Sequence, residues 1–117
     1  MRYKRYRKII PTITAIMLTE AIGRIQFQNH PETWYNLPMR RITERAKASG
    51  INGDYWERAD GCKMYGKYII VAADWTLHPY GTVIETSRGL GLVLDTHTAK
   101  DRSVVDLAVT WGKGGKK

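Results

Sequence analysis

The sequence predicts a small, mainly β domain in the form of a barrel, with one short helix at its start. Beyond Gly50 the chain consists of brief runs rich in β-branched residues, and glycine or other turn residues separate these runs. Short strands at such close spacing are typical of small barrels. At 117 residues, the chain is long enough for one compact core and too short for two ordinary ones. Strands are expected over residues 68–73, 82–85, 91–94 and 104–109.

The first 22 residues are predicted to lie outside this domain. Residues 1–8 hold five basic side chains and no acid, and residues 9–22 are mostly apolar. This order is typical of a secretory signal or a short signal anchor, although the apolar run is short for a membrane span. The alternative is an amphipathic N-terminal helix, because Glu20 interrupts the run. Residues 23–38 contain several helix breakers and no sustained period, which predicts a linker.

The domain itself is expected to span residues 39–112. Its helix is predicted over residues 39–49, where Ile42 and Ala46 lie four positions apart and Gly50 is well placed to end the helix in a left-handed cap. The Gly-Lys-rich residues 113–117 are expected to be a disordered basic tail.

The net charge of +8 is carried by the two ends of the chain. Residues 1–8 and 113–117 together hold eight basic side chains and no acidic one, which leaves 11 basic and 11 acidic residues between them. A formally neutral domain does not indicate a basic groove, so no nucleic-acid partner is expected. Nucleic-acid binding stays open as an alternative, and it would require binding to persist without the two charged ends.

The single cysteine, Cys62, limits the possible chemistry. One cysteine excludes an intramolecular disulfide and a cysteine-rich zinc site. No motif links a histidine to Cys62, so we expect a small, half-buried apolar residue rather than a nucleophile.

The segment His78-Pro79-Tyr80-Gly81 has the signature of a four-residue turn that joins two strands tightly. Proline presets φ at the second position of such a turn, and glycine suits the fourth.

Asp106 occupies an unusual position for a carboxylate. In residues 104–110, a period of two places Val105, Leu107 and Val109 on one face of a strand and Asp106 on the other. Aspartate is uncommon in mid-strand because it packs poorly and competes for backbone hydrogen bonds. The alternative to a functional role is a carboxylate that merely faces solvent.

Three blocks of sequence, in order, resemble the three-aspartate (3D) domain family. Residues 70–83 contain the Ala-x-Asp and Pro-x-Gly-Thr pattern around Asp74, and the blocks around Asp95 and Asp106 follow 21 and 11 residues further on. Trp111-Gly112 at the end of the domain, and Gly53-Asp54-Tyr55-Trp56 and Met64-Tyr65-Gly66 upstream, also fit. The resemblance covers roughly residues 40–112.

This resemblance implies a six-stranded double-psi β-barrel that acts on bacterial peptidoglycan. The family is similar to the catalytic barrel of membrane-bound lytic transglycosylase A and to stationary-phase muralytic proteins. The implied reaction cuts the β-1,4 bond between N-acetylmuramic acid and N-acetylglucosamine, usually leaving a 1,6-anhydro ring. Glycan strands are then the partner, no cofactor and no metal are implied, and a secreted or envelope-associated location is expected, with possible membrane attachment through the N-terminal segment.

The implied reaction requires a carboxyl group that first protonates the departing glycosidic oxygen and then deprotonates the C6 hydroxyl. A partly dry site and a neighbouring carboxylate can raise its pKa enough to hold the first proton near neutral pH. We expect Asp106 to be this acid/base, because its mid-strand setting is the most constrained and apolar of the three. Asp95 is then its charge partner, and Asp74 orients hydroxyls or braces the cleft.

One block departs from the family pattern. The family usually continues the second block as Asp-Thr-Gly-Gly, whereas Asp95-Thr96 is followed here by His97-Thr98. Paired glycines allow positive φ or a close approach to substrate, which His97 cannot provide cheaply, so a remodelled loop is expected. Weakened or lost activity is one possible consequence. The main alternative function is therefore a non-catalytic glycan-binding module of the same fold.

Three further residues are candidates for substrate binding. Thr96 and His97 follow the second aspartate, and Trp75 follows the first. An indole offers a flat apolar face to a sugar ring, but Trp56, Trp75 and Trp111 could equally close a small barrel. His97 could likewise be an ordinary exposed loop histidine.

Overall fold

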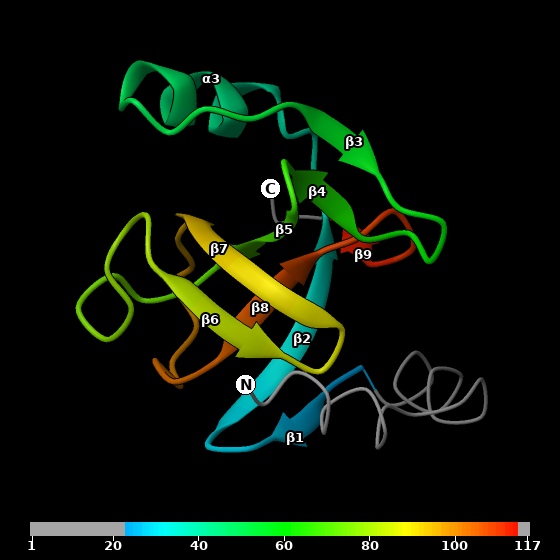
Figure 1. Cartoon of the computed structure of the whole chain (residues 1–117). Coiled ribbons are helices and arrows are strands. Elements are labelled where there is room, and N and C mark those ends of the chain that lie inside the picture. The colour runs from blue at the N-terminus through cyan, green and yellow to red at the C-terminus, as the bar shows by residue number, and fades with distance from the viewer. Residues whose placement is uncertain (1–22, 115–117) are drawn as a thin grey trace.

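The computed structural model describes residues 23–114. Nine strands and one helix lie in this part of the chain, and the strands form one mixed sheet (Figure 1). The mainly β class with one short helix is therefore confirmed. The predicted signal or anchor segment, residues 1–22, lies outside the described residues. The elements are β1 Ile25–Phe27, β2 His30–Asn36, α3 Arg40–Ala48, β3 Tyr55–Glu57, β4 Lys63–Tyr65, β5 Tyr68–Ala72, β6 Val83–Thr86, β7 Gly89–Asp95, β8 Val105–Ala108 and β9 Lys113–Gly114.

Strand β5 lies at the centre of this sheet. One edge of β5 pairs in parallel with β7, while the antiparallel strands β4 and β8 pair with its beginning and its end. The pairing then continues outward from β7 to β6, from β8 to β2 and from β2 to β1, and β9 also pairs with β2. The β5 segment Ile69–Ala72 is fully or almost fully buried, as its continuous apolar sequence requires.

Residues 23–38 are not a linker, so the prediction for this segment is wrong. Most of the segment forms β1 and β2, and β2 runs parallel to β8 from Glu32 to Tyr35. Pairing with residues more than seventy positions away in the sequence stabilises β2. The local sequence pattern does not reveal such partners. The folded unit begins no later than Ile25, rather than at residue 39. At the other end, Lys113–Gly114 pairs with β2, so the predicted tail begins inside the sheet.

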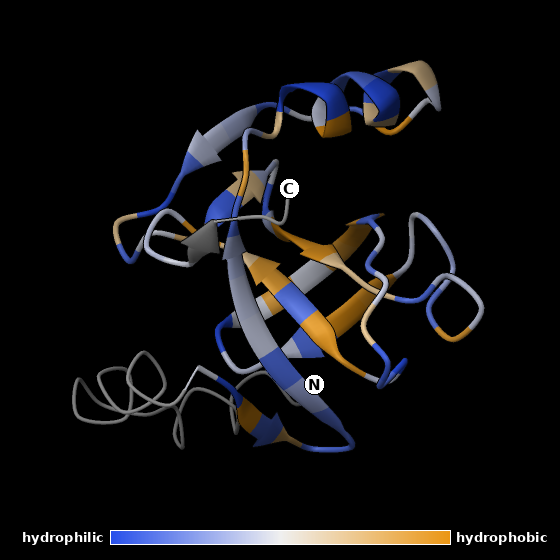
Figure 2. Cartoon of the chain, turned by 180° about the vertical axis from the view of Figure 1, so that it is seen from behind, coloured by the Kyte–Doolittle hydropathy of each residue, from blue (hydrophilic) through white to orange (hydrophobic). Residues whose placement is uncertain are grey.

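Helix α3 agrees with the prediction. Gly50 has φ +88°, the left-handed conformation expected of a C-terminal cap, and the amide of Ile51 donates to the carbonyl of Ala46 at 2.9 Å. Ala46 is fully buried, and Ile42 packs beside the same core cluster. The remainder of the helix is strongly hydrophilic, in contrast to the hydrophobic strands at the centre of the sheet (Figure 2). Helix α3 therefore covers one face of the sheet with a narrow apolar stripe.

The strand that carries Asp106 has the predicted alternation. Val105, Leu107 and Val109 belong to one core cluster, and Ala108 belongs to the cluster on the other face, beneath α3. Asp106 therefore projects to the side of the sheet that α3 covers.

The turn near Pro79 differs from the prediction. The amide of Thr82 donates to the carbonyl of Pro79 at 3.1 Å, so the turn runs from Pro79 to Thr82. Gly81 is its third residue, with φ +87°, which is the glycine position of a type II turn. The ten residues between β5 and β6 also do not join paired strands, because β6 pairs with β7. Proline and glycine correctly predicted a turn, but the turn begins one residue later than predicted.

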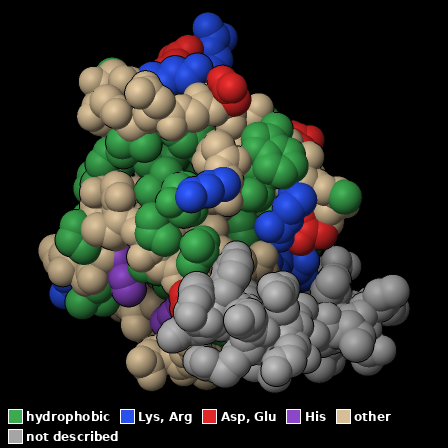
Figure 3. Space-filling view, in the orientation of Figure 1, with side chains coloured by type: hydrophobic (Ala, Val, Ile, Leu, Met, Phe, Trp, Pro, Cys, Tyr) green, Lys and Arg blue, Asp and Glu red, His purple; other side chains and the backbone are tan. Residues whose placement is uncertain are grey.

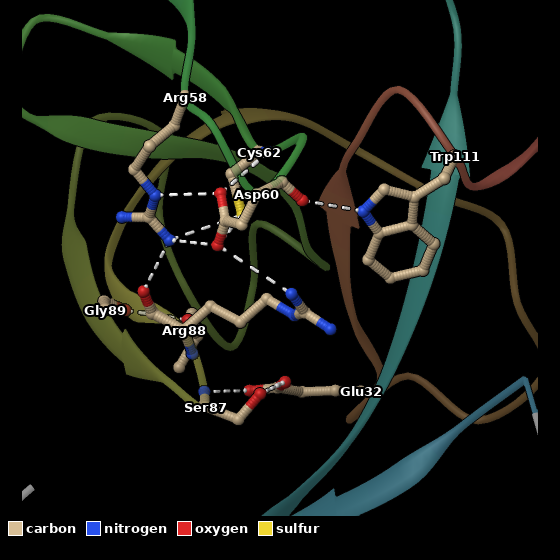
Figure 4. A network of polar contacts seen from close by, with 9 residues as sticks. Glu32, Arg58, Asp60, Cys62, Ser87, Arg88, Gly89 and Trp111 are labelled. Atoms are coloured by element: carbon tan, nitrogen blue, oxygen red, sulfur yellow. Dashed lines mark hydrogen bonds and ion pairs between the residues drawn. The ribbon is translucent and has the colours of Figure 1, made fainter. Parts of the chain in front are cut away.

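A polar network holds the other end of β7, away from Asp95 (Figure 4). Arg58 donates to both carboxylate oxygens of Asp60 at 2.9 Å and to the carbonyl of Arg88 at 2.8 Å. Arg88 in turn lies over the ring of Trp111, 4.8 Å from its centroid. These contacts connect the loop after β3 to the β6–β7 turn and to the segment that follows β8.

Two buried groups extend the network. Glu32 of β2 is fully buried and accepts hydrogen bonds from the amide of Ser87 at 2.8 Å and from its hydroxyl at 2.6 Å. Cys62 is also fully buried, and burial raises the pKa of its thiol to about 12. A thiol with such a pKa is not a nucleophile near neutral pH, in line with the sequence-based expectation of a packing role.

Trp34 tests whether β2 belongs to the folded unit. Its side chain is 6% exposed and its ring centroid lies 5.8 Å from that of Trp111. Because Trp34→Ala leaves a large cavity, we expect it to lower the free energy of unfolding by about 3–5 kcal/mol in urea titrations. The exposed β1 residue Gln26 is the control, and Gln26→Ala should change stability by less than about 0.5 kcal/mol. If both substitutions have equally small effects on stability, the assignment of β2 to the folded unit is contradicted.

Candidate functional site

Two of the three predicted aspartates flank the same residue of β5, one on each neighbouring strand. Ala72 pairs with Asp95 of β7 on one side and with Asp106 of β8 on the other. Residues that pair across neighbouring strands project to the same face of a sheet, so the two carboxylates share a face. The register between β5 and β7 shifts between Val71 and Ala72, and this shift leaves Leu94 as an extra residue in β7. Without this bulge, Asp95 would not lie opposite Ala72.

Asp106 is a largely buried carboxyl group, and within residues 23–114 one hydrogen-bond donor contacts it directly. The hydroxyl of Thr33, on β2, donates to its Oδ1 at 2.8 Å. Burial raises the pKa of Asp106 to about 6, and the carboxylate of Asp95 acts in the same direction, against the opposing effects of Thr33 and His97. Because Thr33 occupies Oδ1, the proton that Asp106 carries below about pH 6 lies on Oδ2. Such a group can act as a general acid and then as a general base.

Asp95 is held by donors from three directions. The phenol of Tyr35 donates to its Oδ2 at 2.8 Å, and the amide of Thr96 donates to its Oδ1 at 2.8 Å. The indole of Trp75 donates to its backbone carbonyl at 2.9 Å. Burial, Asp95 and Asp106 together raise the pKa of Tyr35 well above its usual value, so this phenol remains a donor. One side-chain donor and one backbone donor thus fix the orientation of the Asp95 carboxylate.

Asp74 lies in the loop just beyond β5 and has different partners. Arg102 Nε donates to its Oδ2 at 2.6 Å, and the amide of Thr76 donates to its Oδ1 at 2.8 Å. The hydrogen bond from Arg102 is the largest cause that holds the pKa of Asp74 well below its usual range. Asp74 is therefore a permanently ionised group at neutral pH. Its partners anchor the loop before β8 to the loop after β5, whereas Asp95 and Asp106 interact with each other.

The three candidate substrate-binding residues have distinct positions. Trp75 and Thr96 are exposed beside Asp95, where a ligand could reach them. His97 instead braces its own loop, because its Nε2 lies 2.7 Å from the carbonyl of Val104 and its Nδ1 accepts from the amide of Ala99 at 3.2 Å. A carbonyl can only accept and an amide can only donate, so the proton resides on Nε2. The side chain of His97 thus holds the loop at the position where the family pattern has glycine.

A groove leads to Asp95 between α3 and the segment before it. Its volume is about 410 Å³, and Asp95 forms part of its wall. In the space-filling view, α3 carries basic and acidic side chains at the top of the molecule, above an area of mainly hydrophobic side chains (Figure 3). The lining residues are Leu37, Pro38, Met39, Arg41, Ile42, Arg45 and Asp95.

The sequence reasoning missed four residues of this site. Thr33 and Tyr35 come from β2, which was assigned to a linker, and Arg45 and Arg102 were not singled out. For Thr33 and Tyr35, the available signal was a short run of strand-favouring residues, Thr33-Trp34-Tyr35, between two proline-containing segments. No comparable local signal distinguishes Arg45 or Arg102.

Comparisons with protein-family models, with curated proteins and with solved structures found no match for this chain. The resemblance to the 3D family therefore stays a prediction. Within residues 23–114, no group of three or more His, Cys, Asp and Glu side chains is arranged to hold a metal ion. The same residues contain no helix that is long and apolar enough to cross a membrane.

The raised pKa of Asp106 predicts that stability depends on pH. An unfolded aspartate titrates near 3.8 and the folded one at about 6, so the folded protein binds more protons between these values and loses stability as pH rises through them. Asp106→Asn keeps the acceptor for Thr33 and removes the buried charge. We expect this variant to unfold at higher urea concentrations at pH 8, with a gain of about 2–3 kcal/mol, and to lose the pH dependence.

Asp101→Asn is the matched control, because Asp101 is an exposed carboxylate whose pKa is lowered, chiefly by the Ser103 hydroxyl. This substitution should give no stabilisation at pH 8. The account of Asp106 is contradicted if Asp106→Asn is no more stable than the wild type at pH 8.

Proposed function

We propose that this chain is a peptidoglycan-cleaving enzyme of the lytic transglycosylase type. The observation that carries the proposal is the pair of carboxyl groups on one face of the sheet: Asp106, whose pKa burial raises to about 6, and Asp95, which three donors hold beside an open groove. Acid/base cleavage of a glycoside needs a carboxyl group that can hold a proton and a second carboxyl group close to it.

The fold part of this proposal is a double-psi β-barrel of the 3D type. It is supported by the continuous path of paired strands β6-β7-β5-β8-β2, in which β5–β7 and β2–β8 are parallel pairs. It is also supported by the positions of Asp95 and Asp106, which follow the order of the family's second and third blocks. Membership of that family would place the protein outside the cell or at its envelope, with glycan strands as its partner.

In this mechanism, the proton on Asp106 Oδ2 passes to the glycosidic oxygen between the two sugars as the bond from C1 to that oxygen breaks. The positive charge that develops on the muramic ring is stabilised by the carboxylate of Asp95. Asp106, now ionised, takes the proton of the C6 hydroxyl while O6 bonds to C1 and closes the 1,6-anhydro ring. Asp106 therefore ends protonated, as it began, and the cycle needs no proton from solvent. The hydrogen bond from Tyr35 keeps Asp95 in place throughout.

A non-catalytic glycan-binding module is the second candidate, and two observations favour it. The ion pair between Arg102 and Asp74 occupies one of the three aspartates, and the hydrogen bonds of His97 fix the loop that the family pattern leaves to glycine. A loop held in this way would narrow access to the carboxyl pair. The same surface would then retain glycan without cleaving it.

Turnover separates the two candidates. Incubation of the purified protein with peptidoglycan should release anhydro-muropeptides, which mass spectrometry detects. Because Asp106 supplies both proton transfers, Asp106→Asn should lower the rate by at least about 10²-fold. Since the reaction begins with protonated Asp106, the rate should also fall above about pH 6.

Asp101→Asn provides the matched loss of one carboxylate and should retain wild-type activity. If the wild-type protein binds peptidoglycan and releases no anhydro product, the proposal of a binding module replaces the proposal of an enzyme. If it neither binds nor cleaves peptidoglycan, both candidates fail.

A further inference from the structure

The groove beside Asp95 contains two arginines with no acidic partner in the described part of the chain. Arg41 and Arg45 lie one helical turn apart on α3, and both line the groove. Their neighbour Arg40 is different, because its Nε forms an ion pair with Glu44 at 3.1 Å, at the same four-residue spacing. The helix thus pairs the arginine outside this groove and leaves the two inside it without a counter-charge.

Within the described residues, no ion pair offsets the repulsion between these two arginines. Like charges four residues apart on a helix repel each other and destabilise it. Both side chains are exposed, so neither contributes to the core. A negatively charged ligand in the groove would remove the repulsion and use both guanidinium groups.

Arg45 is also positioned by an aromatic ring. Its guanidinium carbon lies 5.9 Å from the centroid of Trp75, and Trp75 is itself oriented by its hydrogen bond to the carbonyl of Asp95 and by an edge contact with Tyr80 at 5.2 Å. Stacking on an indole restricts a side chain that is otherwise mobile, which lowers the entropy cost of binding. The arginine is therefore held close to the carboxyl pair before any ligand arrives.

The other residues that line the groove indicate which further chemical groups a ligand needs. Leu37, Met39 and Ile42 give the groove an apolar wall, while Asp95 closes its end. A guanidinium group binds a carboxylate through two parallel hydrogen bonds, which distinguishes it from a simple positive charge. The groove thus suits a ligand with apolar carbon, a carboxylate, and a reactive group close to Asp95 and Asp106.

From this geometry we infer that Arg41 and Arg45 bind a carboxylate carried by the acidic peptide stem of the glycan, so that the site selects peptide-bearing glycan over glycan without a carboxylate. This inference rests on the proposed function, because it assigns one substituent of that substrate to the groove. The two arginines are specificity determinants and take no part in proton transfer. Their role is to fix the muramic sugar, to which the stem is attached, beside Asp106.

Binding measurements on Asp106→Asn protein test this inference without interference from turnover. The probes are a peptidoglycan tetrasaccharide that carries its peptide stems and chitotetraose, which has the same length and no carboxylate. Isothermal titration should show at least about 10-fold tighter binding of the peptide-bearing probe, with a preference that declines as salt is added.

Substitution of each arginine should reduce this preference. Arg41→Gln and Arg45→Gln should each weaken the peptide-bearing probe by about 10-fold and leave chitotetraose little changed. Lys47→Gln is the control, because Lys47 is an exposed cation on the same helix that does not line the groove. It removes the same charge and should leave both affinities unchanged.

The outcomes separate this inference from the proposed function. Equal affinity for the two probes, or an equal effect of Lys47→Gln, overturns the inference even if the wild-type protein cleaves peptidoglycan. Selective binding that depends on Arg41 and Arg45, without anhydro products from the wild-type protein, supports the inference and overturns the catalytic proposal. Tight binding of chitotetraose alone would also overturn the inference.

Discussion

The pairing of β5 with β7 on one edge and with β8 on the other is the constraint on which the site depends. Because Ala72 has a partner on each side, two carboxylates 11 residues apart in the sequence are fixed on one face of the sheet. The small side chain between them leaves room for both. Helix α3 then covers part of this face and provides a wall, so that one carboxyl group is largely buried and the other borders an open groove.

This arrangement places a destabilising group near the centre of the molecule, and the fold offsets it elsewhere. A carboxyl group whose pKa is raised by burial costs stability whenever it ionises. At the opposite end of β7, Glu32, Arg58 and Asp60 are buried or half-buried charged groups, and each has several hydrogen-bond partners. The charged groups at one end of β7 are therefore well supplied with partners, whereas near the other end Asp106 is a largely buried carboxyl group whose pKa is raised.

Much of the fold could be predicted from sequence because much of it is encoded locally. The helix and its Gly50 cap, four strands, and the alternation that places Asp106 away from the Leu107 face all follow from short-range pattern. Strand β2 could not be predicted in the same way, since its partner β8 lies more than seventy residues away. The site shares this limit: the aspartates stand out in the sequence, whereas Thr33 and Tyr35, which hold them, are recognisable only once β2 is in place.

The position of β2 also determines when the protein can fold. It is made early, yet its partners β8 and β9 are made some seventy to eighty residues later, and Gly112 packs so closely against the Tyr35 backbone that an added methyl carbon would lie 2.7 Å from the Tyr35 amide nitrogen. A ribosome releases a chain from its beginning, so most of the domain must emerge before the sheet can be completed. Until then, β2 can pair with β1 but not with β8 or β9, and Asp106 does not yet lie beside Asp95. Completion of the sheet therefore waits until β8 and β9 have been synthesised.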